Sequence, residues 1–248
     1  MDLNRFTGFV RRCADDYQML VPGDRVAVGV SGGKDSMALL ASLRHLQRYH
    51  PSHFELEAIT IDMGFPGMDF APVSAWCAEH GVPYTIVKTD IREIVFDARQ
   101  EENPCSLCSK MRRGALNDAI KARGCNKLAL GHHFDDAVET FLMNLLFTGQ
   151  ISCFKPSTYM SRADVWQIRP MLYLGEGTIA SFVRDEGLPL VPTTCPEDKE
   201  SKREEIKSLI KRLSAEYPDL KDKVFGAMQR LPLDGWGKAR HAAARRHK

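Results

Sequence analysis

The sequence has no long apolar segment. No run of hydrophobic residues approaches the roughly 20 residues that a membrane-spanning helix needs. The first residues, from Met1 to Phe6, lead into Arg11 and Arg12 and lack the continuous apolar core of a secretion signal. We therefore expect a cytoplasmic protein with no membrane partner.

The sequence also has little net charge, +2 over 248 residues, so its overall charge does not indicate a nucleic-acid-binding protein. Locally the charge is uneven, because the segments 109–127 and 230–248 each contain six basic residues and one acidic residue. Such a basic cluster is typical either of a solvated helix face or tail, or of a surface that contacts nucleic-acid phosphates. The sequence leaves both interpretations open.

The cysteines do not indicate a disulfide-stabilised protein. There are seven, an odd number, in a chain without a recognisable secretion signal. Cys77 lies in a helical pattern and Cys125 just ahead of a strand, which predicts buried packing residues. Cys105 and Cys108 differ, because they form a CxxC pair of the kind found in metal and redox sites.

Strands and helices alternate along most of the chain. Short β-branched runs predict strands, and apolar residues at helical spacing predict the helices between them. This order predicts an α/β fold with a doubly wound, mostly parallel sheet of about five strands. The expected strands are 25–30, 54–61, 83–88, 127–130 and 166–169.

Helical extensions are expected at both ends of this unit. We interpret residues 1–20 as an N-terminal helix and residues 21–198 as the central domain. Residues 199–248 are interpreted as a helical C-terminal extension with a basic tail. The chain is long enough for one domain of this kind with its extensions.

Three polar segments follow predicted strands. They are the loop Ser31–Ser36, Asp62, and the loop Gly131–Asp136. In parallel sheets, ligands bind beyond the carboxyl ends of the strands. The three segments are therefore expected to meet in one site.

The loop after the first predicted strand has the sequence Ser31-Gly32-Gly33-Lys34-Asp35-Ser36. Its glycines let backbone amides approach a phosphate, and the helix that follows adds the positive end of its dipole. The serines add hydroxyl donors, and Lys34 adds a full charge. The spacing is not that of a Walker A loop, GxxxxGK[ST]. The segment is either a phosphate-binding loop or a glycine turn with a chance lysine.

With a short apolar strand before it and a helix after it, SGGKDS resembles the PP-loop of the adenine nucleotide alpha-hydrolase superfamily. The resemblance implies a HUP-like fold and ATP binding by residues 31–36. It also implies cleavage of ATP between the α and β phosphates. Such enzymes adenylate a carbonyl-type oxygen and release pyrophosphate, after which a nucleophile displaces AMP.

Further motifs follow in a fixed order: Cys105-Ser106-Leu107-Cys108-Ser109-Lys110-Met111-Arg112-Arg113-Gly114, then Leu130-Gly131-His132-His133-Phe134-Asp135-Asp136, and then Cys195. Over roughly residues 20–230, this pattern closely resembles the tRNA 2-thiocytidine synthetase family. Members bind a [4Fe-4S] cluster through three cysteines, which leaves the fourth iron free to hold sulfur. The resemblance implies Cys105, Cys108 and Cys195 as cluster ligands, with ATP and Mg²⁺ as the other cofactors.

The chemistry of thiolates is compatible with this ligand set. Thiolates select iron–sulfur clusters, zinc or copper(I). Three thiolates without an obvious fourth suit a reactive cluster better than a closed zinc site. Zinc with His132 or His133 as a fourth ligand is an alternative, and so is a redox dithiol. The dithiol would leave Cys195 without a role.

The loop after the fourth predicted strand holds further candidates. Gly131 and His132 are candidates for nucleotide binding, although a histidine here can also simply end the strand. Asp135 or Asp136 is expected to hold Mg²⁺ or to assist proton transfer, but the helix dipole alone favours acids at this position. Asp62 either contacts the nucleotide or belongs to an ordinary turn.

Arg112 lies about one helical turn after Cys108. Its guanidinium is expected to stabilise charge on the activated base or on the phosphates. The alternative is a place on a solvated basic face. With Lys34 and Asp35 of the loop, and the acids Asp135 and Asp136, it completes the set of expected catalytic residues.

Together these features predict an ATP-dependent tRNA sulfurtransferase. The O2 of a cytidine attacks the α phosphate, pyrophosphate leaves, and sulfur held on the cluster replaces AMP. Related enzymes that thiolate tRNA thymine carry paired zinc ribbons, which this sequence lacks, so cytidine is favoured. Family members often have a cysteine close before the third ligand, where this chain has Thr193 and Thr194.

Three other functions stay open at this point. One is a different PP-loop ligase without a cluster, such as a lysidine-synthetase-like or amidating enzyme. Another is a non-catalytic, metal-bound RNA-binding protein. The third is a thiolase or dethiolase that acts on a different base. The expected partners are tRNA and a sulfur donor, either sulfide or a cysteine desulfurase, and a homodimer is left open.

Overall fold

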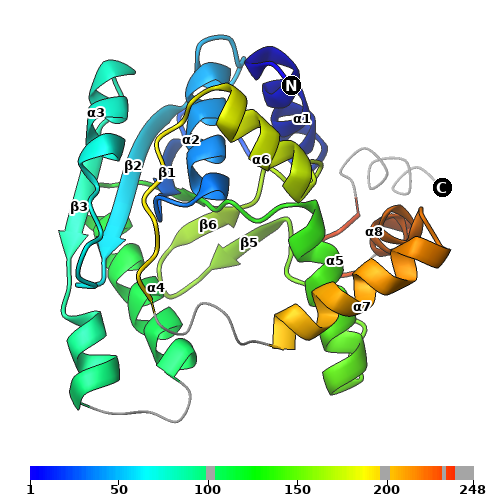
Figure 1. The fold of residues 1–248 in the computed structure, drawn as a ribbon. Coiled ribbons are helices and arrows are strands. Elements are labelled where there is room, and N and C mark those ends of the chain that lie inside the picture. The colour runs from blue at the N-terminus through cyan, green and yellow to red at the C-terminus, as the bar shows by residue number, and fades with distance from the viewer. Residues whose placement is uncertain (99–103, 196–201, 231–232, 238–248) are drawn as a thin grey trace.

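The computed structural model describes residues 1–98, 104–195, 202–230 and 233–237. These residues form a six-stranded sheet in the order β3-β2-β1-β4-β6-β5 (Figure 1). The neighbours from β3 to β6 run parallel, and β5 pairs antiparallel with β6 at one edge. The strands are β1 Arg25–Gly29, β2 Glu55–Asp62, β3 Tyr84–Lys88, β4 Lys127–Ala129, β5 Ser157–Met160 and β6 Val165–Ile168.

The doubly wound, mostly parallel α/β sheet predicted from the sequence is confirmed, with one strand more than expected. β5 was missed because it has only four residues, Ser157–Met160, and none of them is buried. A short edge strand of this kind carries little of the apolar alternation on which the prediction depends.

Helices cover both faces of the sheet (Figure 1). Two π-helical turns, η1 Glu93–Ala98 and η2 Asn144–Thr148, accompany them. None of the helices in the described ranges has the length and apolar character needed to cross a membrane. The α-helices are α1 Leu3–Asp16, α2 Lys34–Gln47, α3 Ala71–Glu79, α4 Pro104–Ala122, α5 Phe134–Met143, α6 Glu176–Asp185, α7 Lys202–Glu216 and α8 Leu220–Arg230.

The two faces of the sheet have separate cores. Alternate residues of a strand point to opposite faces. Val28 and Ala58 therefore pack in a large core with α1, α2 and α6, whereas Ile59 and Leu128 pack in a smaller core beneath α4. Full burial of one such valine, leucine or isoleucine side chain contributes about 1.5–3 kcal/mol to the stability of the fold.

The terminal helices pack against the large core. Phe6 of α1 stacks on Phe182 of α6, with ring centroids 3.9 Å apart. Ile206 of α7 and Phe225 of α8 are buried in the same core. The division of the chain at residues 20 and 198 stays a prediction. Most of the basic tail, residues 238–248, lies outside the described residues.

The order of the strands places the site. From β1 the chain builds β2 and β3 on one side, and then crosses to β4 on the other side of β1. A crevice forms at such a switch point, beyond the carboxyl ends of the two central strands. The loop after β1 is Ser31–Ser36, and the loop after β4 is Gly131–Asp136, so the fold brings the two polar loops together.

Candidate active site

The loop after β1 folds on itself at the start of α2. The hydroxyl of Ser36 donates to the carbonyl of Gly33 (2.9 Å) and accepts from the backbone N–H of Ser31 (3.2 Å). The N–H of Gly33, the N-cap of α2, donates to the Ser31 hydroxyl (3.3 Å). These bonds fix the loop around the helix N-terminus, where backbone amides and the dipole favour an anion.

Gly32 is required by its conformation and by its neighbour. Its φ of +82° lies in the left-handed region, and a Cβ there would lie 2.6 Å from the Cβ of Val191. The N–H of Val191 donates to the carbonyl of Gly32 (3.0 Å). The segment that carries Cys195 is thus fastened directly to the loop, and Figure 1 shows it running from α6 toward α4.

Lys34 lies between two carboxylates. Its Nζ is 3.1 Å from Asp35 Oδ2 and 3.1 Å from Glu176 Oε1 at the start of α6. Burial favours the neutral amine, but the two carboxylates outweigh it and raise the pKa of Lys34. The side chain therefore carries a full positive charge beside the amides of the loop.

The loops after β1 and β4 are in close contact. A Cβ on Gly131 would lie 3.1 Å from the carbonyl oxygen of Asp35. His133 Nε2 lies 3.8 Å from Asp35 Oδ1 and 3.4 Å from Asp136 Oδ2. Asp35 Oδ1 is buried and has no hydrogen-bond partner. A buried carboxylate oxygen without a donor is a place where a cation or a donor from a ligand would be stabilised.

The two acids at the start of α5 have different surroundings. Asp135 Oδ1 binds Lys221 Nζ (2.6 Å), and its Oδ2 accepts the N–H of Glu176 (2.7 Å). Asp135 therefore ties α5 to α6 and α8. Asp136 Oδ1 lies 3.0 Å from Arg203 Nη1, and its Oδ2 accepts the N–H of His133 (2.9 Å). Asp136 lines the cavity described next, whereas Asp135 does not.

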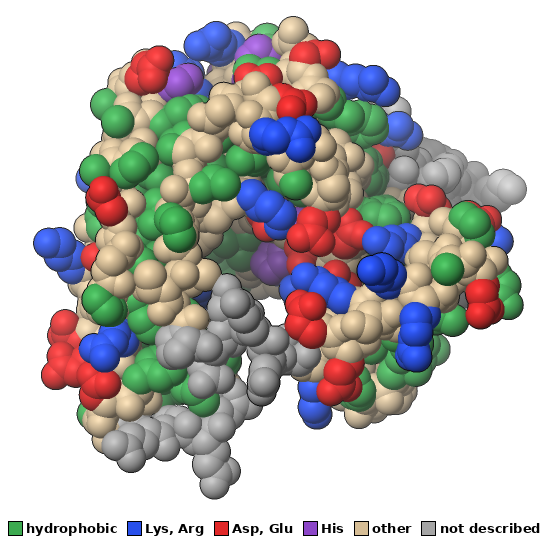
Figure 2. Space-filling model, in the orientation of Figure 1, with side chains coloured by type: hydrophobic (Ala, Val, Ile, Leu, Met, Phe, Trp, Pro, Cys, Tyr) green, Lys and Arg blue, Asp and Glu red, His purple; other side chains and the backbone are tan. Residues whose placement is uncertain are grey.

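A cavity of about 640 Å³ lies at the carboxyl ends of the strands. Figure 2 shows the molecule hollowed near the middle of this face, with a histidine inside the hollow and acidic and basic side chains around it. The cavity joins the loop after β1 to α4 and to the ends of β4 and β6. Its polar wall includes Ser31, Asp35, Ser36, Ser109, Arg112, Arg113, His132, Asp136, Gln167, Arg169 and Arg203.

Cys108 of the CxxC pair lies beside this cavity. Cys108 Sγ is 3.6 Å from the sulfur of Met63, which lines the cavity. Burial, together with the thiols of Cys195 and Cys105, raises the pKa of Cys108, and Arg112 opposes the shift. The thiols of Cys195 and Cys105 thus influence the electrostatics of Cys108. In the described part of the chain, no group of three or more His, Cys, Asp or Glu residues is arranged to hold a metal ion.

The segment before Cys195 has a fixed place. Thr194 Oγ1 donates to the carbonyl of Pro66 (3.0 Å), and the N–H of Cys195 donates to Thr193 Oγ1 (3.3 Å). Thr193 and Thr194, where family members often have a cysteine, therefore position the chain at Cys195.

Cys77 and Cys125 are buried, as their sequence patterns predicted.

Two sequence-derived candidates lie outside the cavity. Asp62 ends β2, and its carboxylate accepts the N–H of Gly64 (3.0 Å), so it stabilises a turn. Lys127, counted among the basic residues of segment 109–127, is buried and pairs with Asp24 (2.7 Å). Lys127 therefore belongs to the interior and not to a phosphate-binding surface. The sequence analysis counted it with the surface residues because sequence periodicity does not reveal a buried ion pair.

Comparisons with known proteins agree with this geometry. The PP-loop domain family model matches residues 7–213. The tRNA-cytidine(32) 2-sulfurtransferase of Syntrophotalea carbinolica is 37% identical over 229 residues, which cover 91% of this chain and 87% of the relative. That of Geobacter sulfurreducens is 37% identical over 222 residues, covering 88% and 86%.

The chain belongs to the tRNA-cytidine(32) 2-sulfurtransferase family of PP-loop proteins. A solved structure supports the assignment. The U34-tRNA thiolase from Methanococcus maripaludis, described with its [4Fe-4S] cluster, is similar to this chain with a TM-score of 0.72 and 26% identity. The match covers 90% of this chain and 77% of that one. The resemblances drawn from SGGKDS and the CxxC segment are thereby confirmed.

In this PP-loop chain the structure adds three site residues that the sequence did not single out. They are Glu176, which binds Lys34, and Arg169 and Arg203, which line the cavity. Glu176 starts a helix, and Arg203 lies in a charged one, where acids and bases are common on solvated faces. The packing of α6 and α7 against the loops brings Glu176 and Arg203 to the site, so no local sequence signal marked these two residues.

Burial also sets the charge of the histidine in the cavity. Burial is the main cause that lowers the pKa of His132 to about 4, and the positive charge of Arg169 is the second. His132 is therefore neutral at physiological pH. Its Nδ1 is buried without a hydrogen-bond partner, so the ring can accept from or donate to a ligand according to its tautomer.

The raised pKa of Glu139, a buried residue of α5, predicts how the stability of the protein depends on pH. Glu139 is 4% exposed, and burial raises its pKa from 4.5 to about 7, although Arg203 Nε at 3.6 Å opposes this. The stability that the protonated form provides is complete below pH 4.5 and is lost as the pH rises to about 7. Glu139→Gln should therefore raise the free energy of unfolding at pH 8 by up to about 3 kcal/mol, and by little near pH 4.5.

Urea unfolding of both proteins with a chelator present, at the two pH values, measures this difference. The matched control is Glu204→Gln on the exposed side of α7, which should change neither value by more than about 0.5 kcal/mol. An equal gain from Glu139→Gln at both pH values would show that the pKa of Glu139 is the same in the folded and the unfolded protein, which would contradict the raised pKa.

Proposed function

We propose that this chain is an ATP-dependent tRNA thiolase that replaces the O2 of cytidine 32 with sulfur. The observation that carries the proposal is the cavity, which joins the PP-loop to the helix that bears the CxxC pair. An adenylated base held at the loop would then lie in a cavity whose lining residue Met63 contacts Cys108. The names of the relatives supply the nucleotide position.

The PP-loop binds the phosphates of ATP. The amides at the start of α2, the hydroxyls of Ser31 and Ser36, and the charge of Lys34 stabilise the negative charge that grows as pyrophosphate leaves. The apolar wall of the cavity, which includes Ile61, Met63 and Phe70, suits the adenine ring. Glu176 holds Lys34 in place before ATP arrives.

Mg²⁺ fits the oxygen donors of Asp35 and Asp136. Both line the cavity, and Asp35 Oδ1 is buried without a partner, so a cation would satisfy it. When bound with ATP, the ion supplies charge neutralisation at the phosphates. Asp135 does not line the cavity and ties α5 to Lys221 and the N–H of Glu176, so we assign it a structural role.

A [4Fe-4S] cluster fits the three thiols of Cys105, Cys108 and Cys195. The donors are all sulfur, and Cys108 lies beside the cavity, with its Sγ 3.6 Å from the sulfur of the cavity-lining Met63. When bound, such a cluster supplies sulfur at the one iron that no cysteine holds. Arg112, which lines the cavity and acts on Cys108, favours the thiolate and is placed to stabilise negative charge during exchange.

The base is activated before sulfur enters. The O2 of cytidine attacks the α phosphate, the bond to the β phosphate breaks, and pyrophosphate leaves. Sulfur then adds at C2, and AMP departs with the original O2. The chain's own residues position the reactants and exclude water, which is the main source of acceleration in such transfers. We place the reaction in the cytoplasm, with sulfide or a cysteine desulfurase as the sulfur source.

Nucleoside mass analysis tests the proposed function. Total tRNA is digested from cells that lack the protein, and from the same cells supplied with the wild-type chain. We expect 2-thiocytidine to be absent from the first and restored in the second. Unchanged 2-thiocytidine without the protein, or a different thiolated base that depends on it, would contradict the proposal.

A further inference from the structure

Among the residues that the structure describes, Arg169 is a buried charge without an acidic partner. It follows β6 directly and is 6% exposed. Within the described ranges no carboxylate forms an ion pair with it, and its Nε has no hydrogen-bond partner. Burial lowers the pKa of Arg169 to about 10, so the group is still charged at physiological pH. A buried charge is costly unless it is paired, and the described residues do not supply that pair, so Arg169 is suited to an anionic ligand.

The guanidinium is held in a fixed orientation. Its Nη1 donates to the carbonyl of Lys155 (2.5 Å), and its carbon lies 4.8 Å from the centre of the Phe154 ring. These contacts fix one edge and one face of the group and leave Nε unused. Since Arg169 lines the cavity, a ligand there would meet a guanidinium that is already ordered.

Other basic groups surround the same end of the cavity. Arg113 of α4 lines it and lowers the pKa of Arg169, as one positive charge does to another. Arg169 and Arg203 both lower the pKa of His132. Asp136 is the acid that lines the cavity at this end, and Arg203 and the N–H of His133 already engage it. Like charges that converge in this way require an anion.

We infer that Arg169, together with Arg113, binds a backbone phosphate of the tRNA next to the target nucleotide. The inference rests on the proposed function, which supplies the RNA. The phosphates of ATP already have the PP-loop amides and Lys34. A target base must leave its stack to enter the cavity, and the phosphates that flank it then come close to the wall. A planar guanidinium with free N–H donors is well suited to a phosphate.

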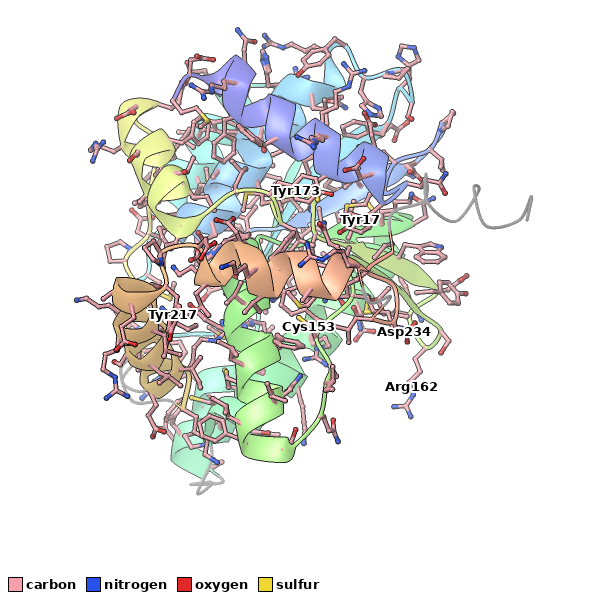
Figure 3. The ribbon with its side chains drawn as sticks, turned by 90° about the vertical axis from the view of Figure 1, so that its right-hand side faces the viewer. Tyr17, Cys153, Arg162, Tyr173, Tyr217 and Asp234 are labelled. Atoms are coloured by element: carbon pink, nitrogen blue, oxygen red, sulfur yellow. The ribbon has the colours of Figure 1, made fainter. Side chains whose placement is uncertain are left out.

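The test compares Arg169→Met with Arg162→Met. Methionine keeps much of the side-chain length and removes the charge. Arg162, in the turn between β5 and β6, is exposed and extends away from the protein (Figure 3). Arg113→Met provides a second variant on an exposed helix position, where a loss of folding is not expected. For each protein the affinity for unmodified tRNA is measured at several salt concentrations, with ATP affinity and thermal melting alongside.

We expect Arg169→Met to weaken tRNA binding roughly tenfold and to reduce the slope of log affinity against log salt by about one. Arg113→Met should act in the same direction, and Arg162→Met should match the wild type. ATP affinity should stay within about twofold of the wild type, because its phosphates bind elsewhere. The melting temperature of Arg169→Met should not fall, because an unpaired buried charge is removed.

Other outcomes overturn the inference. Loss of ATP affinity with unchanged tRNA affinity would assign the phosphate to the nucleotide. A lower melting temperature with an unchanged salt slope would show that Arg169 only packs against Phe154. A failure of the proposed function would be detected in a separate measurement, because the wild-type protein itself would then not thiolate tRNA.

Discussion

Lys34→Ala is expected to lower tRNA-dependent pyrophosphate release about 10²–10³-fold while leaving the fold intact. Lys34 is held between Asp35 and Glu176 at the start of α2, with a raised pKa and thus a full charge. The charge that grows on the leaving pyrophosphate would lose this stabilisation. The side chain is partly exposed and contributes little to the core, so thermal melting should change by only a few degrees at most.

Lys223→Ala is the matched control for this experiment. Lys223 of α8 is also paired with a carboxylate, Asp219, at 2.8 Å, but it is exposed and lies outside the loop Ser31–Ser36. Its loss should leave pyrophosphate release unchanged. Normal release from Lys34→Ala, with the protein folded, would remove the assignment of the PP-loop as the phosphate site.

Cys195→Ser should remove most of the iron from protein purified without oxygen and abolish thiolation. Cys105→Ser and Cys108→Ser should do the same, since a cluster held by three thiolates depends on each of them. The broad absorption near about 400 nm, which arises from thiolate-to-iron charge transfer, should disappear. ATP binding should survive, because a separate loop holds the phosphates.

Cys77→Ala and Cys125→Ala are the controls, because both residues are buried packing residues away from the cavity. These variants should keep the wild-type iron content. One tightly bound zinc and no iron in anaerobic wild-type protein would contradict the cluster, and would favour the zinc site that the CxxC pair alone also allows.

Local sequence patterns predicted most of the helices and strands of this chain. β1 is a short β-branched run, and α2 has apolar residues at helical spacing, so both were predictable from their own residues. β5 was not, because its four residues are held in the sheet by pairing with β6 and not by an apolar pattern of their own. The switch point between β1 and β4 was not predicted, because the spatial order of the strands depends on packing between distant segments.

The site divides in the same way. SGGKDS and the CxxC segment are contiguous, and their chemistry can be read from adjacent residues. The different roles of Asp135 and Asp136 could not be predicted from the sequence, because they depend on Lys221 and Arg203 from distant helices. Arg169 gave no signal either, since its importance lies in a missing partner, which only the folded environment reveals.

The most direct test of the account uses one reaction. Anaerobic protein with a reconstituted cluster is mixed with unmodified tRNA, ATP, Mg²⁺ and sulfide, and the products are quantified together. We expect 2-thiocytidine, AMP and pyrophosphate to form in equal amounts, and all three to form about 10²–10³-fold more slowly with Lys34→Ala. AMP and pyrophosphate formed without 2-thiocytidine, or 2-thiocytidine formed without ATP, would contradict the coupling of the PP-loop to the three cysteines.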